Sequence, residues 1–161
     1  WIGIQLIAED GDDGEQIVLR RAQKSFPADA EVHYRLGRSY RLTGQAWLSA
    51  DCLKKALDGE THEWTKMYPG MRDVAQKEGK KEAADYFGKV ILAEQHHAKR
   101  YANLLKLLKE GNLYKSDKPE KWFCTNCGYI HTGTEAPKEC PACKHEQGYF
   151  IRKCMLEYGE K

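Results

Sequence analysis

Residues 122–150, WFCTNCGYIHTGTEAPKECPACKHEQGYF, contain two Cys-x-x-Cys pairs separated by twelve residues. The first pair is Cys124 and Cys127, and the second is Cys140 and Cys143. Each pair can form a tight turn that directs both sulfurs at one ion, and four thiolates suit a tetrahedral zinc or iron site. The spacing therefore predicts a single tetrathiolate metal centre. It does not separate a redox-active iron from a structural zinc.

The residues around the cysteines fit a small metal-centred module. Gly128 directly follows Cys127 and permits a backbone conformation that brings amide N–H groups close to the sulfurs. Such hydrogen bonds stabilise thiolate charge and raise the reduction potential of an iron. The segment is also rich in aromatic residues that can build a core around the metal, which so short a module needs. These residues are Trp122, Phe123, Tyr129, Tyr149 and Phe150.

Two long helical segments are predicted upstream of this module, because apolar residues recur there at helical spacing. The first runs through residues 49–79, where Pro69 should kink or break it. The second runs through residues 81–110 and ends at Gly111. Residues 112–121 are polar, contain a proline and predict a linker.

Polar residues interrupt the apolar stripes of both segments. Glu60 and Glu63 lie on the inward stripe of the first, and Glu94 and His97 lie on that of the second. Buried carboxylates need a compensating cation, and Glu with Glu-x-x-His is the ligand set of di-iron carboxylate bundles. Each pattern is also common on solvated helix faces, so the spacing alone leaves both interpretations open.

An internal period of 34 residues marks the first part of the chain. Residues 19–22, LRRA, fall on residues 53–56, LKKA, and Ile2-Gly3 falls on Leu36-Gly37. This period resembles the tetratricopeptide repeat, a helix-pair unit. The alternative is two ordinary amphipathic helix pairs with a chance period.

Bulk composition narrows the class of protein. The 161 residues carry a net charge of +2 and are 41% hydrophobic, which predicts a packed core and neither a nucleic-acid nor a membrane partner. No cationic-then-apolar leader opens the sequence. Paired cysteines in a leaderless chain indicate metal binding in a reducing, cytoplasmic setting.

Three stretches together resemble the rubrerythrin family. Residues 53–69, LKKALDGETHEWTKMYP, and residues 93–101, AEQHHAKRY, resemble its third and fourth bundle helices, and the cysteine run resembles its rubredoxin-like tail. The resemblance implies a mononuclear iron on the four cysteines and iron ligation by Glu60, Glu63, Glu94 and His97. It also implies a mainly α fold: half of a ferritin-like four-helix bundle, preceded by tetratricopeptide-like helices and followed by a small β-rich module.

The expected domain boundaries follow from these patterns. They are 1–48 for the repeat-like helices, 49–111 for the helical hairpin, 112–121 for the linker, 122–152 for the iron module and 153–161 for a tail.

Half of the ligand set implied by the resemblance is missing, because residues 1–48 contain no Glu-x-x-His. A symmetric homodimer could rebuild a di-iron site from two half-bundles. The alternatives are a site that binds one metal weakly or none, and a chain whose working centre is the tetrathiolate.

Three functions are consistent with the sequence. The first is a rubrerythrin-like peroxidase for hydrogen peroxide, supplied with electrons by an external reductase through the tetrathiolate iron. The second is a non-enzymatic rubredoxin-type electron carrier on a helical scaffold. The third is an interaction protein with a structural zinc ribbon.

Overall fold

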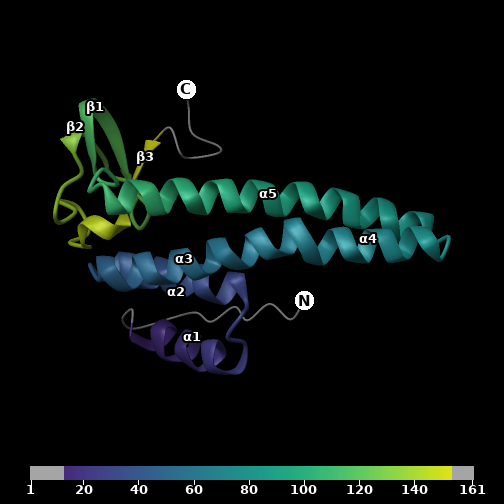
Figure 1. The fold of residues 1–161 in the computed structure, drawn as a ribbon. Coiled ribbons are helices and arrows are strands. Elements are labelled where there is room, and N and C mark those ends of the chain that lie inside the picture. The colour runs from purple at the N-terminus through teal and green to yellow at the C-terminus, as the bar shows by residue number, and fades with distance from the viewer. Residues whose placement is uncertain (1–12, 154–161) are drawn as a thin grey trace.

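Helices make up most of the structure, and a small sheet follows them (Figure 1). The computed structural model describes residues 13–153. Within these residues, no helix is long and apolar enough to span a bilayer. The helices are α1 (Asp13–Ser25), α2 (Ala30–Leu42), α3 (Ala46–His62), η1 (Glu63–Met67), α4 (Tyr68–Lys77), α5 (Lys81–Lys109) and η2 (Gln147–Tyr149). The strands are β1 (Lys115–Cys124), β2 (Ile130–Glu135) and β3 (Phe150–Arg152). The expected mainly α fold with a small β-rich module is confirmed.

The first three helices pack on one another through a small apolar cluster. Asp29 begins α2, because its side chain accepts a hydrogen bond from the Val32 backbone N–H at 2.8 Å. The buried side chains of this cluster come from all three helices: Leu19, Leu36, Tyr40 and Cys52. The first twelve residues of the expected repeat lie outside the described part of the chain.

A π-helical segment, η1, joins α3 to α4 without a break in the helical path (Figure 1). The sequence predicted a kink or break at Pro69. Instead, Pro69 lies in the first turn of α4 with helical residues on both sides, so its missing N–H removes one hydrogen bond from a continuous helix. The wider π turn precedes it, so the interruption is absorbed as a local change of helical pitch.

The α3–η1–α4 rod and α5 lie side by side as an antiparallel hairpin (Figure 1). The rod begins at Ala46, slightly before the expected boundary at residue 49. Residues 78–80 make the turn, and α5 returns along both α3 and α4. This hairpin brings the C-terminal end of α3 against the middle of α5, which is where the candidate ligands lie.

The sheet has the order β2-β1-β3, and both pairings are antiparallel. Strand β1 begins at Lys115, so most of the segment expected as a linker is strand. That segment pairs irregularly with β2, because the register shifts between Lys115 and Glu120. Its side chains are mostly exposed, which explains why its composition resembles that of a loop.

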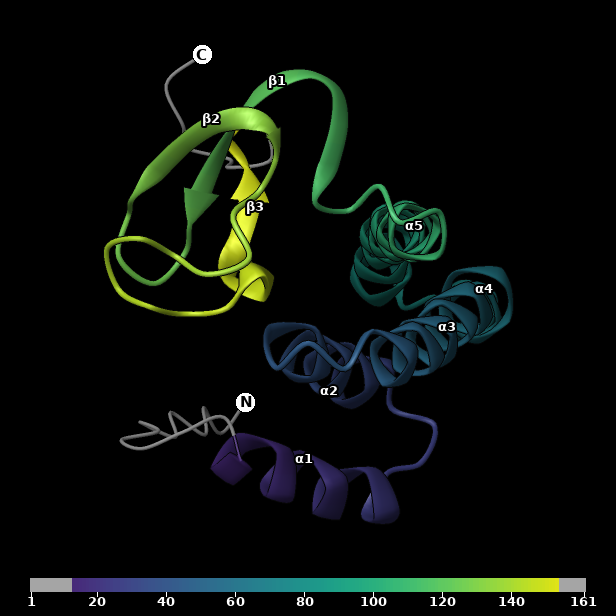
Figure 2. The same ribbon diagram turned by 90° about the vertical axis from the view of Figure 1, so that its left-hand side faces the viewer.

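The sheet module docks on α2, as the view along the helices shows (Figure 2). The Arg41 guanidinium donates hydrogen bonds to the Gly148 carbonyl and, at 3.3 Å, to the Tyr114 hydroxyl. Gly148 is buried against the α2 backbone. The module is therefore held by its own chain's helices as well as by the connection from α5.

Candidate metal centres

The four cysteines of the module converge on one point. Their sulfurs all lie within 4.8 Å of one another. The Sγ atoms of Cys124 and Cys143 are 3.7 Å apart, and so are those of Cys127 and Cys140. This donor set fits a tetrahedral ion that prefers sulfur, as iron and zinc do.

Two matching turns hold the sulfurs. In the first, the Gly128 N–H donates to the Cys124 carbonyl at 2.9 Å, and in the second the Lys144 N–H donates to the Cys140 carbonyl at the same distance. Gly128 has φ 80° and Lys144 has φ 64°, so both adopt the left-handed conformation. Glycine adopts it freely, whereas lysine adopts it at a cost. Lys144 was not singled out in the sequence, but its position one residue after the second pair matches that of Gly128.

Backbone amides stabilise thiolate charge at this centre. The His145 N–H donates to the Cys143 sulfur and is the main cause that lowers the pKa of this thiol to about 6. The Tyr129 N–H occupies the corresponding place at Cys127. Burial and the neighbouring thiols nevertheless raise the pKa of Cys127 to about 12, and burial raises that of Cys124. Because a metal binds the deprotonated sulfurs, its binding must release protons from these thiols.

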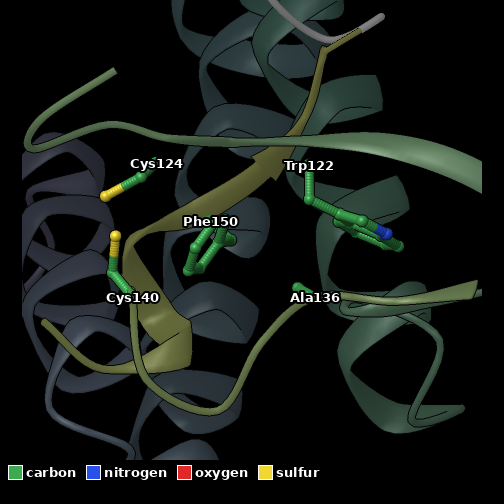
Figure 3. Close-up of a cluster of buried hydrophobic side chains, with 5 residues drawn as sticks. All are labelled: Trp122, Cys124, Ala136, Cys140 and Phe150. Atoms are coloured by element: carbon green, nitrogen blue, oxygen red, sulfur yellow. The ribbon is translucent and has the colours of Figure 1, made fainter. Parts of the chain in front are cut away.

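A compact core supports the cysteine turns (Figure 3). Trp122 and Phe150 are almost fully buried beside Cys124 and Cys140. The Trp122 indole N–H donates to the Gly133 carbonyl at 2.9 Å, so its one polar group is satisfied. Tyr129 and Tyr149 pack against this cluster, so four of the five aromatic residues expected around the metal form its core, and Phe123 does not.

A second cluster lies inside the helical hairpin. Glu60 of α3 and Glu94 and His97 of α5 place ligand atoms within 4.8 Å of one another. His97 Nδ1 is 2.6 Å from a Glu94 carboxylate oxygen and 3.4 Å from Glu60 Oε2. The Glu60 side chain is 6% exposed and that of His97 is 42% exposed, so the cluster is buried on one side and open on the other.

The electrostatics of this cluster favour an added cation. Burial, and after it the neighbouring Glu94 carboxyl, raises the pKa of Glu60 from 4.5 to about 8. Glu60 Oε2 is buried without a hydrogen-bond partner within the described chain. A cation in this place would neutralise the carboxylates and satisfy that oxygen, so the residues fit a carboxylate-bound metal.

Glu63 lies outside this group of three. Its side chain is half-buried, and burial followed by the charge of Glu94 raises its pKa. Glu63 is the first residue of the π segment, where the helical spacing widens. The structure thus brings three of the four expected ligands together and leaves the fourth nearby. His62 and His96, which are next to the candidate ligands in the sequence, are exposed.

An aromatic pair adjoins the cluster. The Tyr101 ring stacks on the Tyr34 ring with centroids 4.6 Å apart and faces the His97 ring at 6.4 Å. Arg100 lies over Tyr34 and donates a hydrogen bond to its hydroxyl at 2.9 Å. Tyr101 belongs to the apolar stripe of α5, but the role of Tyr34 had no signal in the sequence because α2 lies far from α5 along the chain.

A helical hairpin with a carboxylate–histidine cluster, followed by a tetrathiolate module, defines a non-haem iron protein of the type that carries a rubredoxin-like domain. The family model "Rubrerythrin" matches residues 4–105, and the model "Rubrerythrin, rubredoxin-like domain" matches residues 122–151. The chain belongs to the rubrerythrin family, and iron is the expected metal. The tetratricopeptide interpretation has no support, since the rubrerythrin model itself covers most of that segment.

Two curated relatives show how far the similarity extends. The chain is 44% identical over 92 residues to rubrerythrin of Nitratidesulfovibrio vulgaris, covering 57% of this chain and 48% of the relative. It is 45% identical over 98 residues to rubrerythrin of Clostridium perfringens, covering 61% and 50%. The chain therefore spans about half the length of these relatives. A nigerythrin structure in a mixed-valence state aligns with 88% of this chain and 79% of its own at 22% identity, with a TM-score of 0.39, too low to define a shared arrangement.

Proposed function

We propose that this chain is an electron-transferring iron protein that reduces hydrogen peroxide in oxidative stress defence. One observation carries the proposal: the chain contains two separate donor sets, four converging thiolates and the buried Glu60, Glu94 and His97 cluster. The first suits single-electron transfer, and the second suits a carboxylate-bound metal pair. Neither set alone would favour a peroxide-reducing protein.

The proposed ligands divide between the two centres. Cys124, Cys127, Cys140 and Cys143 would hold one iron, and Glu60, Glu63, Glu94 and His97 would contribute to a paired-iron site. When bound, the paired irons would supply two electrons to hydrogen peroxide. The tetrathiolate iron would return electrons to the paired irons one at a time.

The carboxylates control the proton balance of the helical site. Because the pKa of Glu60 is raised to about 8, this group holds a proton at neutral pH when no cation is present. Loading a cation must expel that proton. His97 Nδ1 faces both carboxyls, 3.4 Å from Glu60 and 2.6 Å from Glu94, so the three groups that would hold the cation surround that proton.

The paired site would need residues from a second copy of the chain. Within residues 13–153, no other His, Cys, Asp or Glu joins the cluster, and His97 is open on one side. Two half-bundles related by a twofold axis would each contribute one set of ligands. Analytical ultracentrifugation with iron quantitation tests this: we expect a dimer with two irons per chain, whereas a monomer with one iron per chain would contradict it.

The remaining partners follow from the same proposal. An external reductase would supply electrons to the cysteine module in a cytoplasmic setting. The domain plan that we propose keeps residues 49–111 as the half-bundle and residues 122–152 as the electron-entry module. The docking of Gly148 on α2 supports electron delivery from a fixed position.

A second function has a specific observation in its favour. The open side of the carboxylate cluster and its three-residue ligand set also suit a chain in which only the cysteine module works, as a rubredoxin-type electron carrier. Peroxide turnover of the wild type and of Glu94→Ala decides between the two. If both lack activity while the cysteine module is still reduced and reoxidised, the carrier is correct. A colourless protein containing zinc would instead indicate the structural zinc ribbon.

A further inference from the structure

His97 is the most exposed of the three residues that bring ligand atoms together in the helical cluster. Its side chain is 42% exposed, against 6% for Glu60 and 13% for Glu94. An imidazole ring can rotate about its χ2 bond over a broad range unless something holds it. Metal-binding histidines are usually held by a hydrogen bond from the second ring nitrogen. Within residues 13–153, the polar partners of His97 are both carboxylates of the cluster, and both face Nδ1.

A tyrosine ring lies against the His97 ring instead. The Tyr101 ring is nearly parallel to it, with an interplanar angle of 19° and a centroid distance of 6.4 Å. This distance is within the range of offset-stacked aromatic pairs. Tyr101 follows His97 by one turn of α5 and is only 3% exposed, so its ring is confined. The orientation of the His97 ring therefore depends on packing rather than on a second hydrogen bond.

Tyr34 of α2 packs directly on Tyr101. The two rings have centroids 4.6 Å apart and an interplanar angle of 14°, a closer contact than the one with His97. Arg100 holds Tyr34 in turn, since it donates a hydrogen bond to the Tyr34 hydroxyl at 2.9 Å and lies 5.4 Å from the ring centroid. Without the Tyr34 ring, Tyr101 would lose the side chain that stacks on it, and His97 would lose a fixed neighbour.

The position of Tyr34 is set by the packing of α2 on α3. Leu36 is 1% exposed, and Gly37 lies so close to α3 that a Cβ there would stand 3.2 Å from the Cys52 Cβ. None of the candidate ligands comes from α2. Tyr34 nevertheless brings this helix against the residue that supports a ligand.

We propose that Tyr34 is a positioning residue for the helical metal site. Through Tyr101, it holds the His97 ring in the orientation that binds a cation together with the two carboxylates. This inference rests on the metal-binding role proposed above for the cluster. A ring that is already oriented loses less rotational freedom when a metal binds, so the affinity of the site is higher. Removing an outer contact of a metal ligand commonly lowers metal affinity tenfold or more, and an indirect contact should have a somewhat smaller effect.

Titration of the full chain with Mn²⁺ tests the proposal. One equivalent of Zn²⁺ first fills the cysteine module, because thiolates select zinc, and Mn²⁺, which suits carboxylates, then reports on the helical cluster. Electron paramagnetic resonance measures the Mn²⁺ that stays free. We expect Tyr34→Ala to weaken Mn²⁺ binding about threefold to tenfold. Tyr34→Phe keeps the ring and should bind Mn²⁺ as tightly as the wild type.

Tyr86→Ala is the matched control, because Tyr86 is an exposed tyrosine of α5 that does not belong to the stack. Its Mn²⁺ affinity should equal that of the wild type. A second measurement uses no metal in the helical cluster: the NMR signals of the His97 ring protons at a fixed pH. A stacked Tyr101 ring shifts these signals, so Tyr34→Ala should move them, whereas Tyr34→Phe and Tyr86→Ala should not. Retention of zinc by the module and an unchanged circular dichroism spectrum show that each variant is folded.

The proposal is overturned if Tyr34→Ala binds Mn²⁺ as tightly as the wild type, or if Tyr34→Phe or Tyr86→Ala weakens binding as much as Tyr34→Ala does. A wild type that binds no Mn²⁺ would instead contradict the proposed metal site. In that case the NMR signals decide the positioning role, and His97 signals that are the same in the wild type and Tyr34→Ala would overturn it.

Discussion

Gly148 lies so close to Arg41 that a Cβ on Gly148 would stand 2.4 Å from the Arg41 carbonyl oxygen. The two residues are 107 positions apart, and the Arg41 side chain also donates a hydrogen bond to the Gly148 carbonyl. This pair fixes where the cysteine module sits on α2. The absence of a side chain at position 148 is what permits the contact.

Replacing Gly148 with alanine should release the module from α2. The added methyl group would also meet the Leu42 Cα at 2.7 Å, which neither backbone can relieve without moving. We expect a loss of about 1–3 kcal/mol in the free energy of unfolding and a larger radius of gyration in solution scattering. Gly88→Ala is the control, because nothing lies within 4 Å of its Cβ position and it should stabilise α5 by about 0.5–1 kcal/mol. An unchanged radius in Gly148→Ala would show that the contact does not hold the module.

Replacing Lys144 with glycine should stabilise the cysteine module. Lys144 holds φ 64° in the turn that matches the one containing Gly128, and a left-handed lysine costs roughly 1–2 kcal/mol. The greater flexibility of glycine in the unfolded chain offsets part of this gain, so we expect the free energy of unfolding to rise by about 1 kcal/mol. Thermal unfolding followed by the visible absorbance of the iron-loaded module measures it. The reverse change at the other turn, Gly128→Ala, should lower the same midpoint. Equal midpoints in the wild type and both variants would show that the left-handed conformation at these two positions does not affect stability.

In metal-free protein, the contribution of Glu60 to stability should be lost as the pH rises from about 4.5 to about 8. The lowered pKa of Cys143 acts in the opposite direction above about pH 6, so the Glu60 contribution is measured as the difference between the wild type and Glu60→Gln. The folded state holds a proton on Glu60 over this range while the unfolded state releases it, so this contribution falls with increasing pH and is fully retained below the lower value. The expected loss is roughly 2–4 kcal/mol, measured by urea unfolding at several pH values. Glu60→Gln should flatten this dependence.

Asp58→Asn is the control for that experiment, since Asp58 is an exposed carboxylate on the same helix. Its pH profile should follow that of the wild type. If the difference in stability between the wild type and Glu60→Gln does not change between pH 5 and 8, Glu60 is not held protonated.

Truncating Trp122 to alanine should unfold the module around its metal. This side chain is 0% exposed at the centre of the core, and its indole N–H bonds to Gly133. A loss of about 3–5 kcal/mol is expected, with release of iron at lower temperature. Ile130→Ala, on an exposed position of β2, should change stability by less than about 1 kcal/mol. Iron retention in Trp122→Ala equal to that in Ile130→Ala would contradict a supporting role for the core.

The sequence predicted most of what local spacing controls. Paired cysteines at short separation must face one point, so Cys124 and Cys140 could be assigned without a structure. Glu60, Glu94 and His97 lie on apolar stripes, but spacing left a solvated face as the alternative, and the resemblance to the rubrerythrin family implied that they are ligands. Within each Cys-x-x-Cys pair, and between Glu94 and His97, the separation along the chain is three residues, so local geometry directs both side chains to the same side.

What could not be predicted depends on contacts between distant segments or on departures from regular geometry. The pairing of Arg41 with Gly148, and of Tyr34 with Tyr101, depends on how α2 meets the rest of the chain. Glu63 lies outside the cluster because the helix changes pitch at that residue, and no composition signal marks a π turn. The polar segment before Trp122 pairs as strand because its backbone, not its side chains, makes the contacts.

The π segment between Glu63 and Met67 has a consequence for how this chain can vary in length. It contains one residue more than an α-helical turn would, as if one residue had been inserted into a continuous helix. Deleting one residue there would restore an ordinary helix and leave everything beyond it facing as it does now, because the π turn already absorbs the rotation of about 100° that one residue adds. Tyr68, whose ring lies 6.2 Å from that of Phe87, would stay against α5, and Glu60 would stay in place. A single-residue deletion in this stretch should therefore be tolerated, whereas the same deletion in the regular part of α3 would turn the rest of the rod away from α5.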